Sequence, residues 1–581
     1  DACISDNCGI GDFSAITNKD IKLALKGYKG PKNEKFKGYC LHPDRESCIP
    51  NEITCFKDKD CCSDRSSPYL TRNFNHWSKK GVKGPKPIPG FGNILSPFLT
   101  EQIILEKDWI KKYGKIYGTF EANKPILTIA DPALIKQIMA TDSHANKPIL
   151  TIADPALIKQ IMATDSHVFN INVTDPILQA PAHPILSKTL VASNGQDWRR
   201  VRSLFSPAFS TSKMKTMFAQ MRECLTLLLN NLEPYAMGTG REVELKTMYG
   251  NYTMDAIATC AFGTKLNGYT DASNPFVVNA TRVFTPNPVR QLLSMILPPF
   301  VLKMINMRHI VHESAHEFFF EMTRRIMNER KKSDVKYNDF MGLVMSAEYS
   351  DQSSDHYKNP MDINSNITNE KGGNPGDSYI TNEEILANSW DFFTTGYETT
   401  ATTLAFATYE LSLQQDVQQK LYEEIQSSVD SDGEVDYELI QKMPFLDAVV
   451  TETLRLHSIT LRVGRMAGQD YKLGDTGITL EKGQTVEIPV YGIHHCEEFY
   501  PNPSVFDPKR FLPENSHKLI PYTYLPFGGG HRTCIGMRFA IMLIKLALVH
   551  VMLRYRFVTS KNTDIPVLLK QAGLSHTPER L

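Results

Sequence analysis

Apolar residues recur every three to four positions along much of the chain beyond residue 195. Segments with this helical spacing lie around residues 211–235, 310–331, 383–427 and 534–555. Runs typical of β-strands are short, and they cluster near 460–492 and after 556. The stretch 347–380 is polar and lacks apolar periodicity, so we expect it to form a surface loop. The pattern therefore predicts a mainly α protein with a minor β-sheet.

One segment of 23 residues occurs twice in succession. ANKPILTIADPALIKQIMATDSH occupies residues 122–144 and returns unchanged at 145–167. Each copy is typical of a short strand, PILTIA, followed after Asp-Pro by a helix, PALIKQIMA. Identical copies favour a recent duplication or an assembly error over stacked repeats. Because only one copy can occupy a given place in a sheet, we expect the other to loop out or to pack poorly at the surface.

Cysteine is concentrated at the start of the chain. Seven of the eleven cysteines precede residue 63, namely Cys3, Cys8, Cys40, Cys48, Cys55, Cys61 and Cys62. Their spacing resembles the front half of a small secreted disulfide-rich peptide of the knottin or spider-toxin kind, but the number is odd and no later partners follow. A folded disulfide module and a loosely ordered segment are both open for residues 1–70. The Pro- and Gly-rich run 78–93 leads into the main domain, 71–581.

Charge and hydropathy narrow the function classes. The chain of 581 residues has 64 basic and 64 acidic residues, and this zero net charge gives no sign of a nucleic-acid partner. The longest apolar runs, 291–305 and 539–553, are interrupted by prolines or by charged and polar residues, and fall short of the roughly 18–20 apolar residues needed to span a bilayer. The chain opens on Asp without a visible signal or anchor, so we expect that its original start has been lost.

A glycine-rich loop carries the first candidate chemistry. FGGGHRTCIG, residues 527–536, places Cys534 at the start of an apolar helix, where free N–H groups and the helix dipole favour a thiolate. The glycines allow a tight turn against a flat cofactor, and Gly536 keeps the first helical turn clear of it. Arg532 could pair with a carboxylate at the edge of the cofactor. A buried structural cysteine after a glycine loop is the alternative.

Five motifs together resemble those of the cytochrome P-450 family. The loop F-x-x-G-x-R-x-C-x-G resembles the haem-ligand loop of that family. Upstream stand E-x-x-R, the run PKRF, a W-x-x-x-R helix and LRVGRMAG. The motif residues are Trp198, Arg202, Glu452, Arg455, Arg465, Arg510, Phe527, Gly530, Arg532, Cys534 and Gly536. The resemblance covers residues 71–581, in order, and is strongest to animal family-3A-like microsomal enzymes.

The resemblance implies a role for each motif residue. Cys534 would be the axial thiolate ligand of haem b, with Phe527 and Gly536 beside it. Trp198, Arg202, Arg465 and Arg532 would bind the haem propionates. Glu452, Arg455 and Arg510 would form a buried network that supports the haem loop, whereas an exposed i,i+3 pair is the alternative. Arg199 and Arg200 would face an acidic electron donor or form a solvated basic surface.

A second site is expected in DFFTTGYETTATTLAFATYE, residues 391–410. By resemblance, Glu398 and Thr399 are the acid and alcohol that deliver protons while dioxygen is split. Thr395 to Glu398 also fits a capping box, which would start a helix there. Apolar periodicity on both sides instead predicts one continuous helix, loosened by its threonines. Thr395 departs from the family, which commonly has a small alanine or glycine at this position.

The resemblance implies a monooxygenase that inserts one atom of O2 into a lipophilic, xenobiotic or steroid-like substrate. Electrons would come from NADPH through a flavoprotein reductase. Such enzymes work on the cytosolic face of the endoplasmic reticulum membrane, and residues 290–304 resemble a segment that dips into the membrane surface or form a buried turn. Without an anchor the protein would be peripheral.

A rival function is a secreted cysteine-rich binding or toxin-like protein whose C-terminal part is passive or a catalytically dead haem binder. Residues 1–70 would suit a secretory compartment, which conflicts with a haem domain facing the cytosol. A fusion of two gene models and a natural secreted fusion are the two explanations.

Overall fold

The computed structural model describes the chain in several uninterrupted stretches. These are 150–173, 183–238, 240–266, 275–284, 313–335, 339–346, 380–429, 435–475 and 478–569, with short pieces between 74 and 129 and isolated positions elsewhere. The predicted cysteine-rich module and nearly all of the predicted loop 347–380 lie outside these residues, as does most of the expected membrane-dipping segment 290–304.

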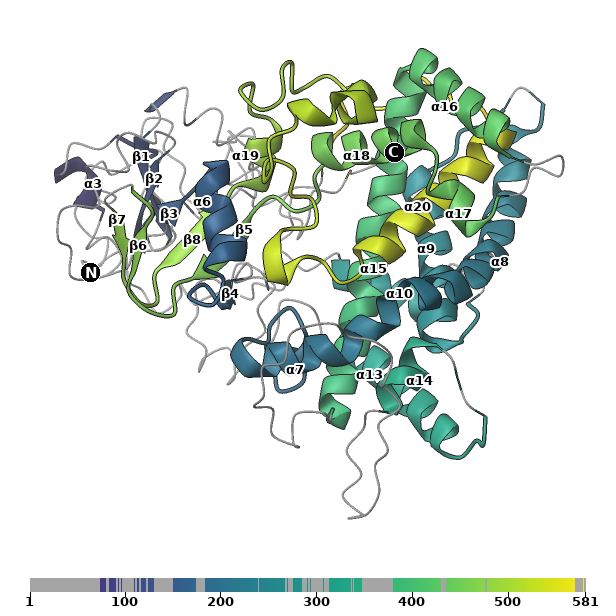
Figure 1. Ribbon diagram of the computed structural model, residues 1–581, viewed down its shortest axis with the longest axis horizontal. Helices are drawn as coiled ribbons and strands as arrows, with labels where there is room; N and C mark the ends of the chain where they lie inside the picture. Colours follow the sequence, from purple (N-terminus) through teal and green to yellow (C-terminus); the bar gives the residue numbers. More distant parts are fainter. Residues whose placement is uncertain are drawn as a thin grey trace, which may run out of the picture.

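Helices make up most of the described chain (Figure 1). The longer ones are α7 (Gly195–Phe205), α8 (Thr211–Ala236), α9 (Leu245–Phe262), α10 (Pro275–Phe284), α13 (Glu313–Lys331), α15 (Asn382–Leu413), α16 (Gln415–Ser428), α18 (Pro444–Leu456) and α20 (Met537–Arg554). The shorter ones are α3 (His76–Lys79), α6 (Pro155–Lys159), α14 (Phe340–Met345), α17 (Tyr437–Ile440) and α19 (Val490–His494). The predicted segments 211–235, 310–331 and 534–555 correspond to α8, α13 and α20. The prediction of a mainly α fold is confirmed.

Helix α15 runs without a break through the expected acid–alcohol site. Its capping box lies at Thr381 and Glu384, at the true start of the helix, and not at Thr395. The prediction of one continuous helix there is confirmed. The apolar segment 383–427 is nevertheless two helices, because the chain turns at Gln414 between α15 and α16.

Strands gather at one end of the molecule in small sheets (Figure 1). A four-stranded sheet has the order β3 (Leu150–Thr151), β8 (Thr485–Ile488), β5 (Val463–Met466), β4 (Ile171–Val173). Two hairpins accompany it, β1 (Ile116–Glu121) with β2 (Lys124–Ile129) and β6 (Tyr471–Leu473) with β7 (Ile478–Leu480). The strands predicted near 460–492 are present. The strand predicted after 556 is wrong for the described residues, where only an isolated bridge joins Leu569 and Pro578.

The two identical copies form strands in different sheets. The strand of the first copy is β2, which pairs antiparallel with β1 over six residues. The strand of the second copy is β3, which pairs parallel with β8, and α6 and a π-helical turn (Gln160–Thr164) follow it. The expectation that one copy loops out is wrong for its strand, because a two-residue connection places the first copy beside β1. The helical part of the first copy lies outside the described residues.

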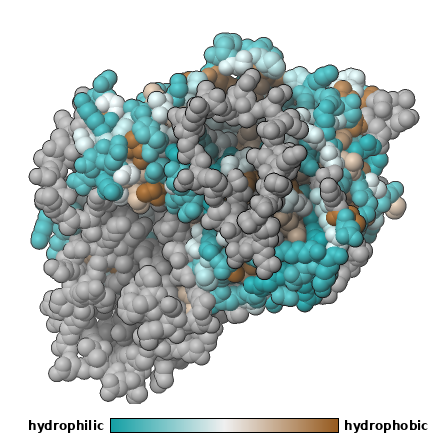
Figure 2. Space-filling model, turned by 60° about the horizontal axis from the view of Figure 1, so that its bottom comes forward, coloured by the Kyte–Doolittle hydropathy of each residue, from teal (hydrophilic) through white to brown (hydrophobic). Residues whose placement is uncertain are grey.

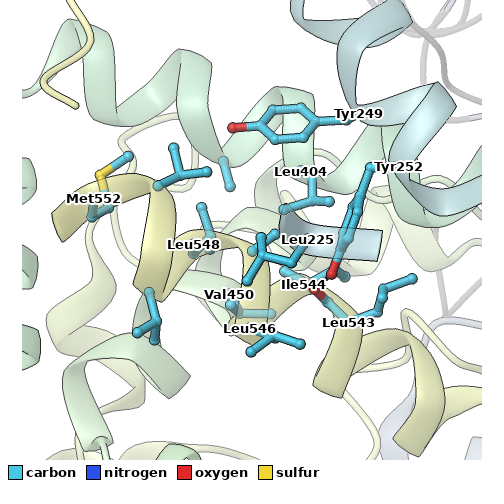
Figure 3. Close-up of a cluster of buried hydrophobic side chains, with 14 of the residues drawn as sticks. Leu225, Tyr249, Tyr252, Leu404, Val450, Leu543, Ile544, Leu546, Leu548 and Met552 are labelled. Carbon is cyan, nitrogen blue, oxygen red and sulfur yellow. Dashed lines mark hydrogen bonds between the residues drawn. The ribbon is translucent and has the colours of Figure 1, made fainter. Parts of the chain in front are cut away.

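Helix α20 fills the centre of the largest apolar cluster (Figure 3). Leu543, Ile544, Leu546 and Leu548 of this helix are buried against α8, α9, α15 and α18, from which Leu225, Tyr249, Tyr252, Leu404 and Val450 point inward. Burying each large aliphatic side chain contributes about 1.5–3 kcal/mol. The apolar run 539–553 is therefore a core helix, and its first turn follows the Cys534 loop directly.

The search for a helix that could cross a bilayer finds none in the part of the chain that the structure describes. On the face shown in Figure 2, hydrophilic residues predominate between the grey regions, and apolar residues form only small patches.

Candidate active site

The loop Phe527–Gly536 folds back on itself ahead of α20. The backbone N–H of Cys534 donates to the carbonyl of Phe527 at 2.9 Å, and Phe527 packs against the core cluster of α20. The backbone N–H groups of Gly536 and Met537, at the start of α20, counteract part of the rise in the pKa of the Cys534 thiol that burial causes. The backbone of the loop is thus fixed to the core cluster, and the Cys534 thiol lies on the side away from that cluster.

The Cys534 thiol is accessible to solvent yet closely surrounded by protein. Its side chain is exposed, but burial raises its pKa, while the N–H of Gly536 and the Arg202 guanidinium oppose that rise. Without a bound metal cation, a thiol with a raised pKa stays protonated; it loses its proton when it coordinates such a cation. An accessible sulfur of this kind suits a metal ligand better than a packed structural cysteine.

The glycines of the loop serve two different purposes. Gly528 and Gly530 have φ of 71° and 66°, which favours glycine. A Cβ on Gly530 would lie 1.8 Å from the carbonyl oxygen of Met162, in the π-helical turn of the second copy. A Cβ on Gly536 would meet no atom within 4 Å. Gly530 is therefore required by packing against protein, whereas a side chain on Gly536 would enter open space.

Three arginines converge on the Cys534 loop. Arg202, from α7, donates to the carbonyl of Thr533 at 2.9 Å. Arg465, from β5, donates to Asn172 Oδ1 at 2.7 Å. Arg532 follows the glycines and donates to the carbonyl of Ser193 at 3.0 Å. Elements far apart in the sequence therefore bring all three guanidinium groups to one place.

The three guanidinium groups have no acidic partner. Within the described ranges, no carboxylate lies at salt-bridge distance from Arg202, Arg465 or Arg532. Burial lowers the pKa of Arg465 to about 10, and burial together with Arg465 and Arg202 lowers that of Arg532 to about 9. Burial also lowers the pKa of Arg202, against an attraction to Cys534. Clustered buried cations repel one another unless an anion joins them, so the arrangement suits a ligand with two or more negative charges.

Trp198 completes this cluster. The guanidinium of Arg532 lies 4.1 Å from the centroid of the Trp198 ring, a cation–π contact. Trp198 and Arg202 lie one helical turn apart on α7, as the W-x-x-x-R spacing predicts. The structure thus brings together Trp198, Arg202, Arg465, Arg532 and Cys534, which the sequence marks separately.

Glu452, Arg455 and Arg510 form a buried network behind the loop. Arg455 donates twice to the Glu452 carboxylate, at 2.7 and 2.8 Å, and neither side chain is exposed. Arg510 lies 3.4 Å from the same carboxylate, which also accepts the N–H of Asp507 at 2.8 Å. Arg455 further donates to the carbonyls of His494 and Pro503, both at 2.8 Å. The network joins α18 to the segment that precedes the Cys534 loop.

Glu398 and Thr399 lie within α15 in different settings. Glu398 is buried and its Oε2 lies 2.9 Å from Lys246 Nζ of α9. The Thr399 hydroxyl donates to the carbonyl of Thr395 at 2.7 Å, and none of the described residues donates a hydrogen bond to its oxygen. Thr395, one turn before Thr399 on the same side of α15, is exposed and donates to the carbonyl of Asp391 at 2.6 Å. The threonine bonds run along the helix as the sequence predicts.

Known proteins are similar to this chain over most of its length. A family model for cytochrome P450 matches residues 143–581. Cytochrome P450 3A29 of Sus scrofa is 32% identical over 522 residues, covering 88% of this chain and 92% of that protein. Cytochrome P450 3A41 of Mus musculus is 32% identical over 510 residues, covering 87% and 91%. Cytochrome P450 3A12 of Canis lupus familiaris is 30% identical over 512 residues, covering 87% and 92%.

The chain belongs to the cytochrome P450 family. Membership makes it an oxidoreductase, a monooxygenase that uses haem with a thiolate ligand, and confirms the family expected from the motifs. The residues fit this cofactor on two structural observations: the thiol is accessible beside an open glycine, and three arginines with no acidic partner among the described residues suit the two propionates of haem.

One cytochrome P450 surface predicted from the sequence is not formed as expected. Arg200 does not face solvent for a partner, because it pairs with Glu384 at the start of α15, and both side chains are largely buried. The Arg200 guanidinium also contributes to holding the pKa of Glu384 below its usual range, against the effect of burial. Arg199 is exposed on α7. Of the two residues, only Arg199 is exposed.

Sequence reasoning missed the residues that orient the site residues. Asn194 Oδ1 accepts from Arg532 at 3.0 Å, and Asn172 holds Arg465. Lys246 pairs with Glu398 although 152 residues separate them. None of these three carries a motif. A pattern search along the chain could not have found them, because the partners meet only after the helices cross.

Proposed function

We propose that this cytochrome P450 oxidises lipophilic small molecules of xenobiotic or steroid-like character, with electrons from NADPH through a flavoprotein reductase. The observation that carries the proposal is the meeting of an accessible cysteine with three arginines that lack acidic partners. The similarity to family-3A enzymes of mammals supports the substrate class. We further propose the cytosolic face of the endoplasmic reticulum membrane as its location.

Each motif residue has a proposed part in holding the haem. Cys534 supplies the axial sulfur, and its backbone bond to Phe527 keeps the loop closed. Trp198 and the three arginines hold the propionates, because opposite charge removes their mutual repulsion. Gly536 leaves room for the macrocycle. Glu452, Arg455 and Arg510 hold the loop from behind.

When bound, the haem activates dioxygen so that one oxygen atom enters the substrate and the other leaves as water. The protons for that water come through the chain's own groups. Thr399 accepts a hydrogen bond at its free lone pairs and passes a proton on, while its hydroxyl is oriented by Thr395. The protons come from solvent; the Glu398 carboxylate, whose position Lys246 fixes, would take up each proton as a base and release it again as an acid toward Thr399.

The axial ligand is tested first by spectroscopy. The purified protein, reduced under carbon monoxide, is expected to give the Soret shift typical of thiolate ligation. Cys534→Ala should abolish the shift, and Cys496→Ala, at a half-buried cysteine outside the loop, should keep it. A shift that survives Cys534→Ala would refute the ligand assignment.

Catalysis is tested next in a reconstituted system. With a flavoprotein reductase and NADPH, the protein should consume oxygen and form hydroxylated product from members of a steroid and drug panel. Substrate-dependent NADPH consumption without product in any member would instead indicate a damaged haem binder. Cell fractionation that recovers the protein away from the endoplasmic reticulum would contradict the proposed location.

We also propose that residues 71–581 are the monooxygenase and that residues 1–70 form a separate module. The similarity to mammalian enzymes over 88% of the chain supports this boundary. Long-read sequencing of the transcript across codons 60–80 distinguishes a natural fusion from two joined gene models.

A further inference from the structure

The imidazole of His494 contacts the chain just ahead of the Cys534 loop. His494 is the last residue of α19, which packs against α18 (Figure 1). The backbone N–H of Leu525 donates to His494 Nε2 at 2.9 Å, although 31 residues separate the two. Both side chains are buried. Leu525 stands two positions before Phe527, where the loop begins. The histidine ring therefore fixes the backbone at the entrance to the loop.

This hydrogen bond requires a neutral imidazole. A ring nitrogen that accepts an N–H carries a lone pair, so the proton of the neutral ring is on Nδ1. Burial, together with His495 and Arg455, lowers the pKa of His494 to about 3, which keeps the ring neutral. Nδ1 is buried and hydrogen-bonds to none of the described residues. A buried donor without an acceptor destabilises the fold, so packing alone would favour an apolar ring such as that of phenylalanine. What phenylalanine could not supply is the acceptor for the Leu525 N–H.

His494 also connects the loop to the buried ion-pair network. Its backbone carbonyl accepts a hydrogen bond from Arg455 Nη1 at 2.8 Å. On the other side, the carbonyl of Leu525 accepts the N–H of Gly528, the first glycine of the Cys534 loop, at 3.0 Å. Hydrogen bonds thus run from the buried network, through the backbone and then the side chain of His494, to the first turn of the loop.

We propose that His494 is a positioning residue for the axial ligand: its imidazole holds the Leu525 N–H and so keeps the loop in the shape that presents the Cys534 sulfur. The inference rests on the proposed function, in which Cys534 is that ligand. Without the acceptor, the Leu525 N–H would be buried and unpaired, and the turn before Gly528 would open more readily toward water. An open loop displaces the sulfur and lets it take up a proton, so thiolate ligation would be lost more easily.

Two variants separate the acceptor from the ring. His494→Phe keeps an aromatic ring of similar size without an acceptor, and His494→Gln offers an amide oxygen at about the reach of Nε2. The haem-loaded protein is reduced under carbon monoxide, and the thiolate-type Soret band is compared with the band of the form that lacks thiolate ligation. The ratio of the two bands should fall about tenfold in His494→Phe, the effect of one lost hydrogen bond, and should stay within about threefold of the wild type in His494→Gln.

A second measurement follows the hydrogen bond itself. Hydrogen exchange of the Leu525 amide, read by mass spectrometry on a peptide that covers it, should be about tenfold faster in His494→Phe than in the wild type. The matched control is His550→Phe. His550 of α20 is also buried, its Nε2 has no hydrogen-bond partner among the described residues, and burial lowers its pKa to about 4. This control should leave both the band ratio and the Leu525 exchange rate unchanged.

The outcomes distinguish the inference from the proposed function. A wild-type band ratio in His494→Phe, or a ratio in His494→Gln as low as in His494→Phe, would overturn the positioning role and leave the proposed function intact. If His494→Phe does not fold, His494→Asn, whose amide is too short to reach Leu525, takes its place in the comparison. If the wild type gives no thiolate-type band, the ligand assignment in the proposed function fails, while the exchange rates still decide whether His494 holds the loop.

Discussion

Arg455 offers a strong test of the network behind the Cys534 loop. Its guanidinium donates twice to Glu452 and also to the carbonyls of His494 and Pro503, all within 2.8 Å, and neither charged side chain is exposed. Arg455→Ala would leave the buried Glu452 carboxylate with only Arg510, at 3.4 Å, and one backbone N–H. Removing one partner of a buried ion pair costs about 3–5 kcal/mol of unfolding free energy.

Urea unfolding followed by both tryptophan fluorescence and the haem Soret band measures this cost. Arg325→Ala is the matched control, because Arg325 pairs with Glu321 on the surface of α13 at 3.3 Å. That exposed pair is worth about 0.3–0.5 kcal/mol. We expect a large fall in the urea midpoint for Arg455→Ala, with haem lost at the same concentration, and almost none for Arg325→Ala. Equal midpoints for the two variants would refute the stabilising role of the buried network.

Three further perturbations test other parts of the structure. Lys246→Met leaves Glu398 buried without its partner, so the ratio of product formed to NADPH consumed should fall about tenfold or more, whereas Lys265→Met, in an exposed pair, should leave the ratio unchanged. A variant that lacks residues 122–144 should bind haem and melt at no lower temperature than the wild type, because the strand of the remaining copy can pair with β1 on one edge and with β8 on the other. Loss of haem from this variant would contradict that expectation. Burial raises the pKa of Asp255 to about 7, so between about pH 4 and 7 the folded chain binds a proton that the unfolded chain releases, and the unfolding free energy falls as pH rises. Asp255→Asn should therefore be more stable than the wild type above pH 7, by about 1.4 kcal/mol for each unit by which the pKa is raised, and a difference independent of pH would contradict that origin.

Local chemistry could be predicted from the sequence because it depends on short spacings. Trp198 and Arg202 need only one helical turn between them, and the turn around Gly528 and Gly530 needs only their freedom at positive φ. The course of α15 follows likewise from apolar periodicity on both sides of Thr395. In each of these cases the physical cause lies within a few residues.

Partners across helices could not be predicted. Arg200 was expected at the surface, but α7 crosses the start of α15 and brings it to Glu384, 184 residues away. The role of Gly530 was assigned to the cofactor, whereas its lack of a side chain admits the backbone of Met162. Just after the break between α15 and α16, the side chains of Gln415 and Gln418 donate to the carbonyl of Phe557, about 140 residues away. Each of these contacts depends on packing that no local pattern encodes.

The placement of the two identical copies is determined by connectivity alone. Their side chains are the same, so no difference in contact energy can select which copy pairs with β8. The first copy follows β1 after a two-residue connection, and such a hairpin closes within microseconds. The second copy is then the one still available when β8, more than 300 residues later, has been synthesised. Order of synthesis and loop length, rather than amino-acid identity, therefore assign each copy its position in the finished molecule.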